Sequence, residues 1–156
     1  MIDSPVGPLT LVATGGLLSG LYMDEQRHRP AEELFGERDD SLLPEVSEQL
    51  DEYFANMRTT FDLPLTLLGT PFQVEVWTAL QEIRYGETTT YGELAVHLGK
   101  PQAARAVGLA NGKNPISIIV PCHRVVGANG NLTGYGGGLP RKRHLLAHEA
   151  TTPTLF

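Results

Sequence analysis

The sequence predicts a mixed α/β protein with two parts, a small N-terminal region of strands and helix and a C-terminal region that contains a helix-turn-helix. The first 25 residues hold two short apolar stretches joined by glycines, whereas residues 71–112 hold three helical patterns. The chain has 156 residues, of which 41% are hydrophobic and 19% charged, so it can bury a core of its own.

The N-terminal region begins with a predicted β-hairpin. Its two apolar stretches, Leu9–Ala13 and Leu17–Met23, are separated by a Thr-Gly-Gly turn. Residues 24–40 are polar and acidic, which is typical of a loop with a short helix. Pro44 then opens a helix in which apolar residues recur at three- and four-residue steps. Residues 61–68 look extended and lead into the second region.

The C-terminal region begins with strong helix-start signals. Thr70–Gln73 is a capping box with proline at the first helical position, and Thr90–Glu93 is a second capping box. Gly99–Pro101 turns the chain into a third helix, which Asn111-Gly112 ends. Two short helices joined by a tight turn with glycine outline a helix-turn-helix.

The third helix and the charge distribution both indicate what kind of molecule the protein binds. From Gln102 to Ala110 nearly every residue is small, and Arg105 is the one long side chain. This composition suits contact with DNA, or equally a tightly packed helix with a surface salt bridge. Residues 1–99 carry 5 basic and 17 acidic residues, whereas residues 100–156 carry 7 basic residues and Glu149 alone. The asymmetry favours a polyanion partner, although an acidic solubilising region beside an incidentally basic one remains an alternative.

Cys122 is the candidate nucleophile. The β-branched run Ile116–Val120 predicts a buried strand that a proline stops just before Cys122, a position that exposes reactive groups. His123 and Arg124 favour the thiolate, and Glu149 is a candidate orienter for His123. The six glycines of residues 127–138 can bring backbone N–H groups close to a bound base. The alternatives are an inert buried thiol, a set of hairpin turns and an exposed glutamate at a helix end.

Composition excludes other kinds of site and location. The chain has one cysteine, which excludes an internal disulfide and a zinc site built from several cysteines. No stretch approaches the roughly 18 apolar residues that a membrane span requires. No basic segment followed by an apolar block opens the chain, as it would in a secretory signal. We therefore expect a cytoplasmic protein without membrane contact, metal or cofactor.

The surroundings of Cys122 resemble the active-site signature of the methylated-DNA–protein-cysteine methyltransferases, the 6-O-alkylguanine-DNA alkyltransferases. The motif residues are Pro121-Cys122-His123-Arg124-Val125, with Asn114-Pro115 before them and Gly134-Tyr135 and Gly137-Gly138 after them. The similarity continues from Pro71 to Glu149, and residues 4–9 resemble the opening of bacterial members. It implies an N-terminal α/β support domain (1–66), a linker (67–70) and a C-terminal winged helix-turn-helix domain (71–156).

The resemblance also implies a function. A monomer binds double-stranded DNA, flips out the damaged nucleotide and moves an alkyl group, chiefly methyl, from the 6-oxygen of guanine irreversibly onto Cys122. The 4-oxygen of thymine is a secondary target. Each molecule acts once, because the thioether product is stable and no second cysteine takes the group onward.

Each candidate residue takes a role from this resemblance. Cys122 accepts the alkyl group, while His123, held by Glu149, removes the thiol proton through a water. Tyr91 presses on the DNA backbone to rotate the nucleotide outward and donates to the leaving guanine. Arg105 fills the gap in the base stack. Asn114 shapes the active-site turn. The residues that contact DNA are Gln102, Ala104, Arg124 and Lys142. The residues that line the base pocket are Val125, Tyr135, Gly136 and Gly137.

The sequence departs from the family pattern at two points. Some members hold zinc in the N-terminal domain through cysteines, which this chain cannot do. Others have a serine after the pocket tyrosine, where this chain has Gly136 and can offer only a backbone N–H to the base oxygen. Three other functions are alternatives: a non-catalytic alkylguanine-binding protein, against which Cys122 argues, a winged-helix transcription regulator, and a cysteine hydrolase.

Overall fold

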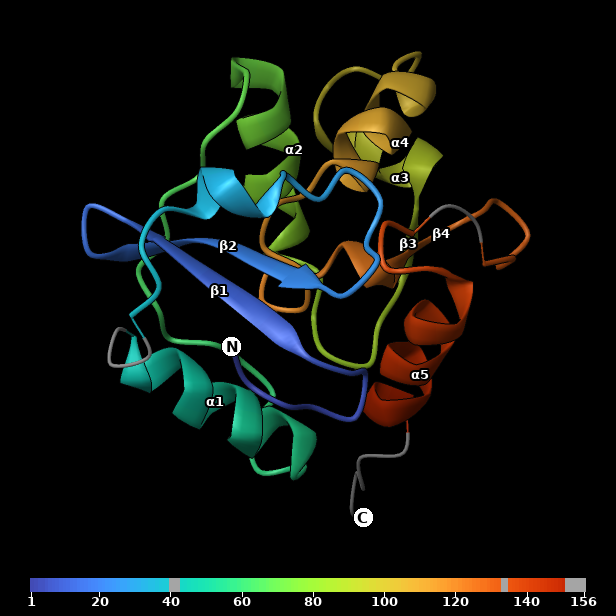
Figure 1. Ribbon diagram of the computed structural model, residues 1–156. Helices are drawn as coiled ribbons and strands as arrows, with labels where there is room; N and C mark the ends of the chain where they lie inside the picture. Colours follow the sequence, from blue (N-terminus) through green and yellow to red (C-terminus); the bar gives the residue numbers. More distant parts are fainter. Residues whose placement is uncertain (40–42, 133–134, 151–156) are drawn as a thin grey trace.

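The computed structural model describes residues 1–39, 43–132 and 135–150 and confirms the mixed α/β class (Figure 1). Asp40 and Gly134, which the sequence analysis used, lie outside these ranges. The elements in chain order are β1 (Leu9–Thr14), β2 (Leu17–Met23), a 3-10 helix (Glu32–Phe35), α1 (Pro44–Phe54), α2 (Pro71–Leu80), β3 (Thr89–Thr90), α3 (Tyr91–His97), α4 (Ala104–Gly112), a 3-10 turn (Cys122–Arg124), β4 (Val125–Val126) and α5 (Leu139–Ala150).

The predicted hairpin is confirmed. β1 and β2 pair antiparallel from Leu9 opposite Met23 to Thr14 opposite Leu17. Gly15 and Gly16 make the turn with φ of 61° and 81°, a left-handed conformation that glycine adopts without strain. In Figure 1 the hairpin crosses the middle of the molecule, with α1 below it and α2, α3 and α4 above. It therefore lies between the two helical groups.

Helix α1 follows the apolar spacing of its sequence. Val46, Leu50 and Tyr53 recur at three- and four-residue steps and are all buried. Pro44 occupies the first turn, where its missing N–H leaves no hydrogen bond unmade. The last turn of α1 carries Tyr53, whose hydroxyl bonds to Glu149 of α5.

The outer edge of β2 holds the segment that leads to Cys122. Leu21 N donates to Pro115 O over 2.8 Å, and Ser117 N donates to Leu21 O over 3.2 Å. Further along the same edge, Thr66 N donates to Leu18 O over 2.9 Å. The N-terminal hairpin thus supports the active-site loop directly through backbone hydrogen bonds.

The helix-turn-helix is confirmed, and side chains cap the starts of α2 and α3, whereas Ala103 at the start of α4 provides no side-chain cap. The Thr70 hydroxyl accepts from Gln73 N while the Gln73 side chain accepts from Thr70 N, which completes the predicted capping box. The second predicted capping box forms only in half: the Thr90 hydroxyl accepts from Glu93 N over 3.1 Å, but the Glu93 side chain does not accept from Thr90 N. Helices α3 and α4 pack together, and the indole of Trp77 on α2 donates to Ala110 O on α4 over 2.8 Å. Helix α4 therefore has a fixed position.

The predicted strand Ile116–Val120 is wrong. Only Ile116 makes a β-bridge, to Leu21, and the residues after it form tight turns. Val120 N donates back to Ile116 O, and Ile118 has φ of 72°. The β-branched side chains are nevertheless buried. They reflect burial in the core, whereas hydrogen bonds within the loop decide its conformation.

The described residues contain no helix with the length and apolar character needed to cross a membrane.

Candidate active site

Asn114 shapes the loop that presents Cys122. Its buried amide donates to Val120 O over 2.8 Å and to Ile116 O over 3.3 Å, and its Oδ1 accepts from Ile116 N over 3.0 Å. One side chain thereby satisfies three backbone groups of the turns that replace the expected strand. The chain then passes Pro121 into the 3-10 turn that carries Cys122, His123 and Arg124.

The Cys122 thiol is buried, with 4% of its surface exposed. The expectation that the loop end exposes it is therefore wrong. Burial raises the pKa of the Cys122 thiol to about 11, which the Asn114 side chain and the Lys142 charge offset only in part. The neighbours His123 and Arg124 do not favour the thiolate as expected, because both are engaged with Glu149. The resting protein holds a thiol.

His123 and Glu149 form the predicted pair. Nε2 of His123 lies 2.7 Å from Oε2 of Glu149, with both side chains fully buried. Burial lowers the pKa of the His123 imidazole, although Glu149 partly counters this, so the ring is neutral at pH 7. Because a carboxylate only accepts hydrogen bonds, Nε2 carries the hydrogen and Nδ1 keeps its lone pair. Nδ1 has no hydrogen-bond partner among the described residues.

Glu149 is buried in α5, so the alternative of an exposed helix-end glutamate is wrong. Arg124 donates from Nε to Oε1 over 2.9 Å and from Nη2 to Oε2 over 3.0 Å. Burial alone would raise the pKa of the Glu149 carboxyl, but hydrogen bonds from His123 and Arg124 bring it down to about 2. Glu149 is therefore ionised throughout the physiological range.

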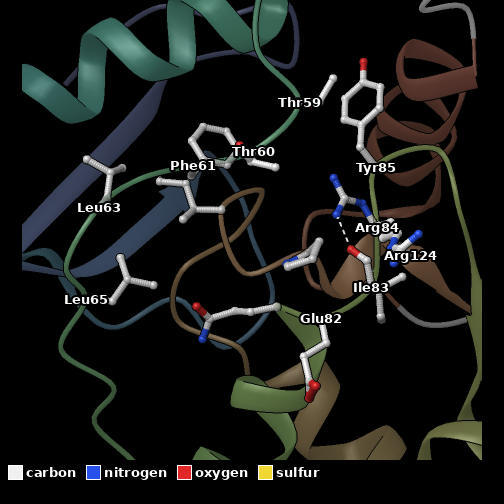
Figure 2. Close-up of a pocket in the computed structure, with 13 residues that line it drawn as sticks. Thr59, Thr60, Phe61, Leu63, Leu65, Glu82, Ile83, Arg84, Tyr85 and Arg124 are labelled. Atoms are coloured by element: carbon white, nitrogen blue, oxygen red, sulfur yellow. Dashed lines mark hydrogen bonds between the residues drawn. The ribbon is translucent and has the colours of Figure 1, made fainter. Parts of the chain in front are cut away.

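Arg124 does not lie on a DNA-binding surface, as the sequence analysis expected. It is buried, and beyond its two bonds to Glu149 it donates to Ile83 O over 2.6 Å. Figure 2 shows this bond and the ring of Tyr85 nearby. The Cζ atom of Arg124 lies 5.7 Å from the centre of that ring. A pocket of about 530 Å³ lies beside this bond; Arg124 and Pro121 help to line it, and Cys122 is not among its lining residues.

Lys142 is likewise an interior residue, although the sequence analysis assigned it to DNA. It is fully buried on α5, and its Nζ donates to Val125 O over 2.6 Å. Burial lowers the pKa of the Lys142 ammonium, whereas the neighbouring Cys122 group raises it. Lys142 therefore acts as an internal cation near the thiol, a position that suits stabilisation of a thiolate as it forms.

Two of the predicted base-pocket residues, Val125 and Tyr135, lie close to Cys122. Val125 follows the 3-10 turn directly, and Tyr135 is buried with its hydroxyl unpaired among the described residues. A Cβ added to Gly137 would lie 2.5 Å from the sulfur of Met23 and 2.8 Å from the Tyr135 ring, so a side chain here would force these neighbours to shift. At Gly136 an added Cβ would make ordinary contacts of 3.5 Å, so the missing serine is not excluded by space.

The predicted DNA contacts on the helix-turn-helix divide by exposure. Gln102 and Arg105 are exposed, and Tyr91 and Ala104 are half-buried at the starts of α3 and α4. The Tyr91 ring packs on α4 at Gly108, where an added Cβ would be 3.7 Å away. Of the seven basic residues after position 99, Arg124 and Lys142 are internal, whereas Lys100, Arg105, Lys113 and Arg143 are exposed. The surface charge is thus smaller than the sequence count suggests.

Two residues near the site were missed by sequence reasoning. Tyr53 of α1 donates from its hydroxyl to Oε2 of Glu149 over 2.8 Å, and Asn111 of α4 donates to Cys122 O over 3.4 Å. Tyr53 belongs to an apolar stripe and so was interpreted as core. Its partner lies 96 residues away, a separation that no local pattern can predict. Within the described ranges, no three His, Cys, Asp or Glu side chains group as a metal site requires.

Two family models cover nearly the whole chain. Residues 71–151 match the 6-O-methylguanine DNA methyltransferase DNA binding domain, and residues 1–67 match the ribonuclease-like domain of the same family. The methylated-DNA–protein-cysteine methyltransferase of Mycobacterium tuberculosis is 56% identical over 148 residues, 95% of this chain and 89% of that protein. The enzyme of the same name from Methanosarcina acetivorans is 48% identical over 97% of both chains.

Solved structures agree with this assignment. The crystal structure of the M. tuberculosis O6-methylguanine methyltransferase superposes with a TM-score of 0.91 at 54% identity, covering 99% of this chain and 93% of that one. The structure of the M. tuberculosis protein in complex with DNA superposes with a TM-score of 0.87 at 53% identity, covering 97% and 91%. With the buried Cys122, His123 and Glu149 in place, the chain belongs to the methylated-DNA–protein-cysteine methyltransferase family.

Proposed function

We propose that this protein repairs O6-alkylguanine in double-stranded DNA as a monomer, by transferring the alkyl group once and irreversibly to Sγ of Cys122. The observation that carries this proposal is the pairing of His123 with Glu149, next to the free cysteine Cys122. The pair leaves Nδ1 of a neutral imidazole free to accept a proton. The family membership supports the same reaction.

The proposed step is a nucleophilic displacement at the alkyl carbon. The thiol proton passes to Nδ1 of His123 through a water, and Glu149 stabilises the imidazolium that results. The Sγ–carbon bond forms while the bond from carbon to the guanine 6-oxygen breaks, with the electron pair leaving on the oxygen. The guanine product regains a hydrogen at its ring nitrogen, so the net change exchanges a thiol hydrogen for an alkyl group.

Activation of the thiol is coupled to substrate in this proposal. A thiol with a pKa of about 11 is almost entirely protonated at pH 7, which protects the free protein from unrelated electrophiles. The buried Lys142 ammonium lies close enough to Cys122 to raise its share of thiolate once the thiol proton can leave. The unpaired Tyr135 hydroxyl can then hydrogen bond to the entering base, whose flipping costs about a few kcal/mol.

The DNA contacts of this proposal come from the helix-turn-helix. Arg105 is exposed at the start of α4, where it can enter the base stack in place of the flipped nucleotide. Tyr91 at the start of α3 can press on the backbone, and Gln102 and Ala104 can contact phosphates from the turn before α4. Lys113 and Arg143 add exposed positive charge, whereas the charge of Lys100 is paired with Glu75 over 2.7 Å.

Mass spectrometry after incubation with a duplex that contains one O6-methylguanine tests the proposal. We expect the intact protein to gain the mass of one CH2 group, on the peptide with Cys122, in a one-to-one ratio with lesions lost. Cys122→Ser is the matched control, since it is nearly isosteric and should bind the duplex without gaining mass. A Cys122→Ser variant that still removes methyl groups, or a wild type that turns over many lesions, would contradict the proposal.

A further inference from the structure

Helix α1 of the N-terminal region reaches the site through one hydroxyl. Tyr53 donates to Oε2 of Glu149 over 2.8 Å, and the Tyr53 side chain is fully buried. This oxygen also lies 2.7 Å from Nε2 of His123 and 3.0 Å from Nη2 of Arg124. Three donors from two segments of the chain, α1 and the 3-10 turn, therefore converge on one carboxylate oxygen, the oxygen that faces the imidazole.

Tyr53 is held rigidly enough to fix the direction of that bond. Its ring packs edge-on against Phe54 and Tyr85 and lies 5.4 Å from the ring of Phe61. Its backbone carbonyl lies 2.8 Å from Nε2 of His148, the residue that precedes Glu149 on α5. The two elements are thus joined both through the Tyr53 backbone and through its hydroxyl.

We propose that Tyr53 is a positioning residue for alkyl transfer, whose hydroxyl holds the Glu149 carboxylate turned toward His123. The inference rests on the function proposed above and adds to it that the N-terminal region completes the proton relay. Burial and the adjacent carboxylate raise the pKa of the Tyr53 hydroxyl well above its ordinary value, so it stays protonated and donates at every working pH.

The expected effect of losing this hydroxyl has a definite sign. Without the Tyr53 donor the Glu149 anion is less stabilised, so its pKa rises. A more basic carboxylate also stabilises the protonated form of His123, so the His123 pKa rises too. Because transfer needs an ionised Glu149 and a neutral His123, both changes move the acid side of the rate–pH profile to higher pH.

Other charged or titratable groups surround these three and must stay unchanged in the comparison. Arg124 and Tyr85 approach from the 3-10 turn and the loop after α2, and His148 and Lys142 approach from α5. Cys122 and Tyr135 complete the set of groups that act on the pair or on Tyr53. None of them is altered by Tyr53→Phe, which removes one oxygen and keeps the ring.

The experiment compares wild type, Tyr53→Phe and Phe61→Leu. Single-turnover methyl transfer from duplex O6-methylguanine is measured between pH 5 and 9, and the His123 ring is titrated by ¹⁵N NMR in the free proteins. We expect Tyr53→Phe to raise the His123 pKa and the acid limb by about one pH unit, as loss of one hydrogen bond to a charged group predicts. Transfer should therefore slow about tenfold on the acid limb and by less at higher pH. Phe61→Leu loosens the same ring cluster and should leave both pKa readings at their wild-type values.

Each result separates the two proposals. A Tyr53→Phe protein with the wild-type acid limb and the wild-type His123 titration would overturn the positioning role and make Tyr53 a packing residue. An equal shift in Phe61→Leu would do the same. A wild-type protein that transfers no methyl group to Cys122 would instead overturn the proposed function, whatever the titrations show.

Discussion

Replacing Glu149 by glutamine should destabilise the fold strongly as well as slow repair. The carboxylate accepts from Tyr53, His123 and Arg124 in the interior, and glutamine keeps its shape but loses its charge. The change leaves the Arg124 guanidinium buried without an anion. It also turns one oxygen into an NH2 group, which cannot accept the hydrogen bonds that the carboxylate accepted. We therefore expect Glu149→Gln to lower the free energy of unfolding at pH 7.

Two independent arguments give the size of this loss in unfolding free energy. Removing one partner of a buried ion pair costs about 3–5 kcal/mol. The lowering of the Glu149 pKa from 4.5 to about 2 corresponds to about 3 kcal/mol of stabilisation at pH 7. Since the folded-state pKa lies below the unfolded value, this contribution is complete above pH 4.5 and is lost as the pH falls toward 2. At pH 7 it is fully present in the wild type and absent from the variant.

Urea unfolding at pH 7, followed by the fluorescence of Trp77, measures the loss, with the exposed Glu48→Gln on α1 as control. Arg124→Met and the double variant complete a cycle. If the loss comes from an unpaired Arg124, the double variant should recover about 2 kcal/mol relative to the sum of the single losses. A Glu149→Gln protein within about 0.5 kcal/mol of Glu48→Gln, the range that ordinary surface changes produce, would refute the reasoning.

Three further predictions concern DNA and the thiol. Arg105→Ala should slow repair of duplex O6-methylguanine about 10- to 100-fold, as a few kcal/mol of unstacking predicts, and leave the rate with the free base nearly unchanged. Binding of the wild type to duplex should weaken steeply with salt, because exposed basic residues of the helix-turn-helix region release counterions. Iodoacetamide should alkylate Cys122 slowly at pH 7 and about tenfold faster for each added pH unit up to about 10, because its thiol pKa is about 11.

Each of these has a contrary result. Equal slowing of duplex and free-base reactions by Arg105→Ala would assign Arg105 to the fold or the pocket. Fluorescence anisotropy at low and physiological salt measures the affinity for duplex DNA. An affinity that does not change with salt would show that these basic residues do not drive binding. Rapid alkylation of Cys122 at pH 7, equal to that of the urea-unfolded chain in mass spectrometry, would show that the resting thiol is neither buried nor protonated.

Local sequence determined the elements whose hydrogen bonds and packing are local. The Gly15-Gly16 turn, the Thr70 capping box and the apolar spacing of α1 each depend on residues within one or two turns of one another, and all three were predicted correctly. The resemblance also predicts Cys122 as the nucleophile and Glu149 as the partner of His123, and His123 and Glu149 are indeed hydrogen bonded.

The tertiary structure decided what depends on burial and on contacts between distant segments. Ile116–Val120 has strand-like composition, yet the Asn114 side chain and the edge of β2 fold it into turns. Arg124 and Lys142 look like DNA-binding cations in sequence, but a buried carboxylate and a backbone carbonyl hold them inside. The high pKa of Cys122 has the same origin, since charge and composition do not reveal which groups lose their water when the chain packs.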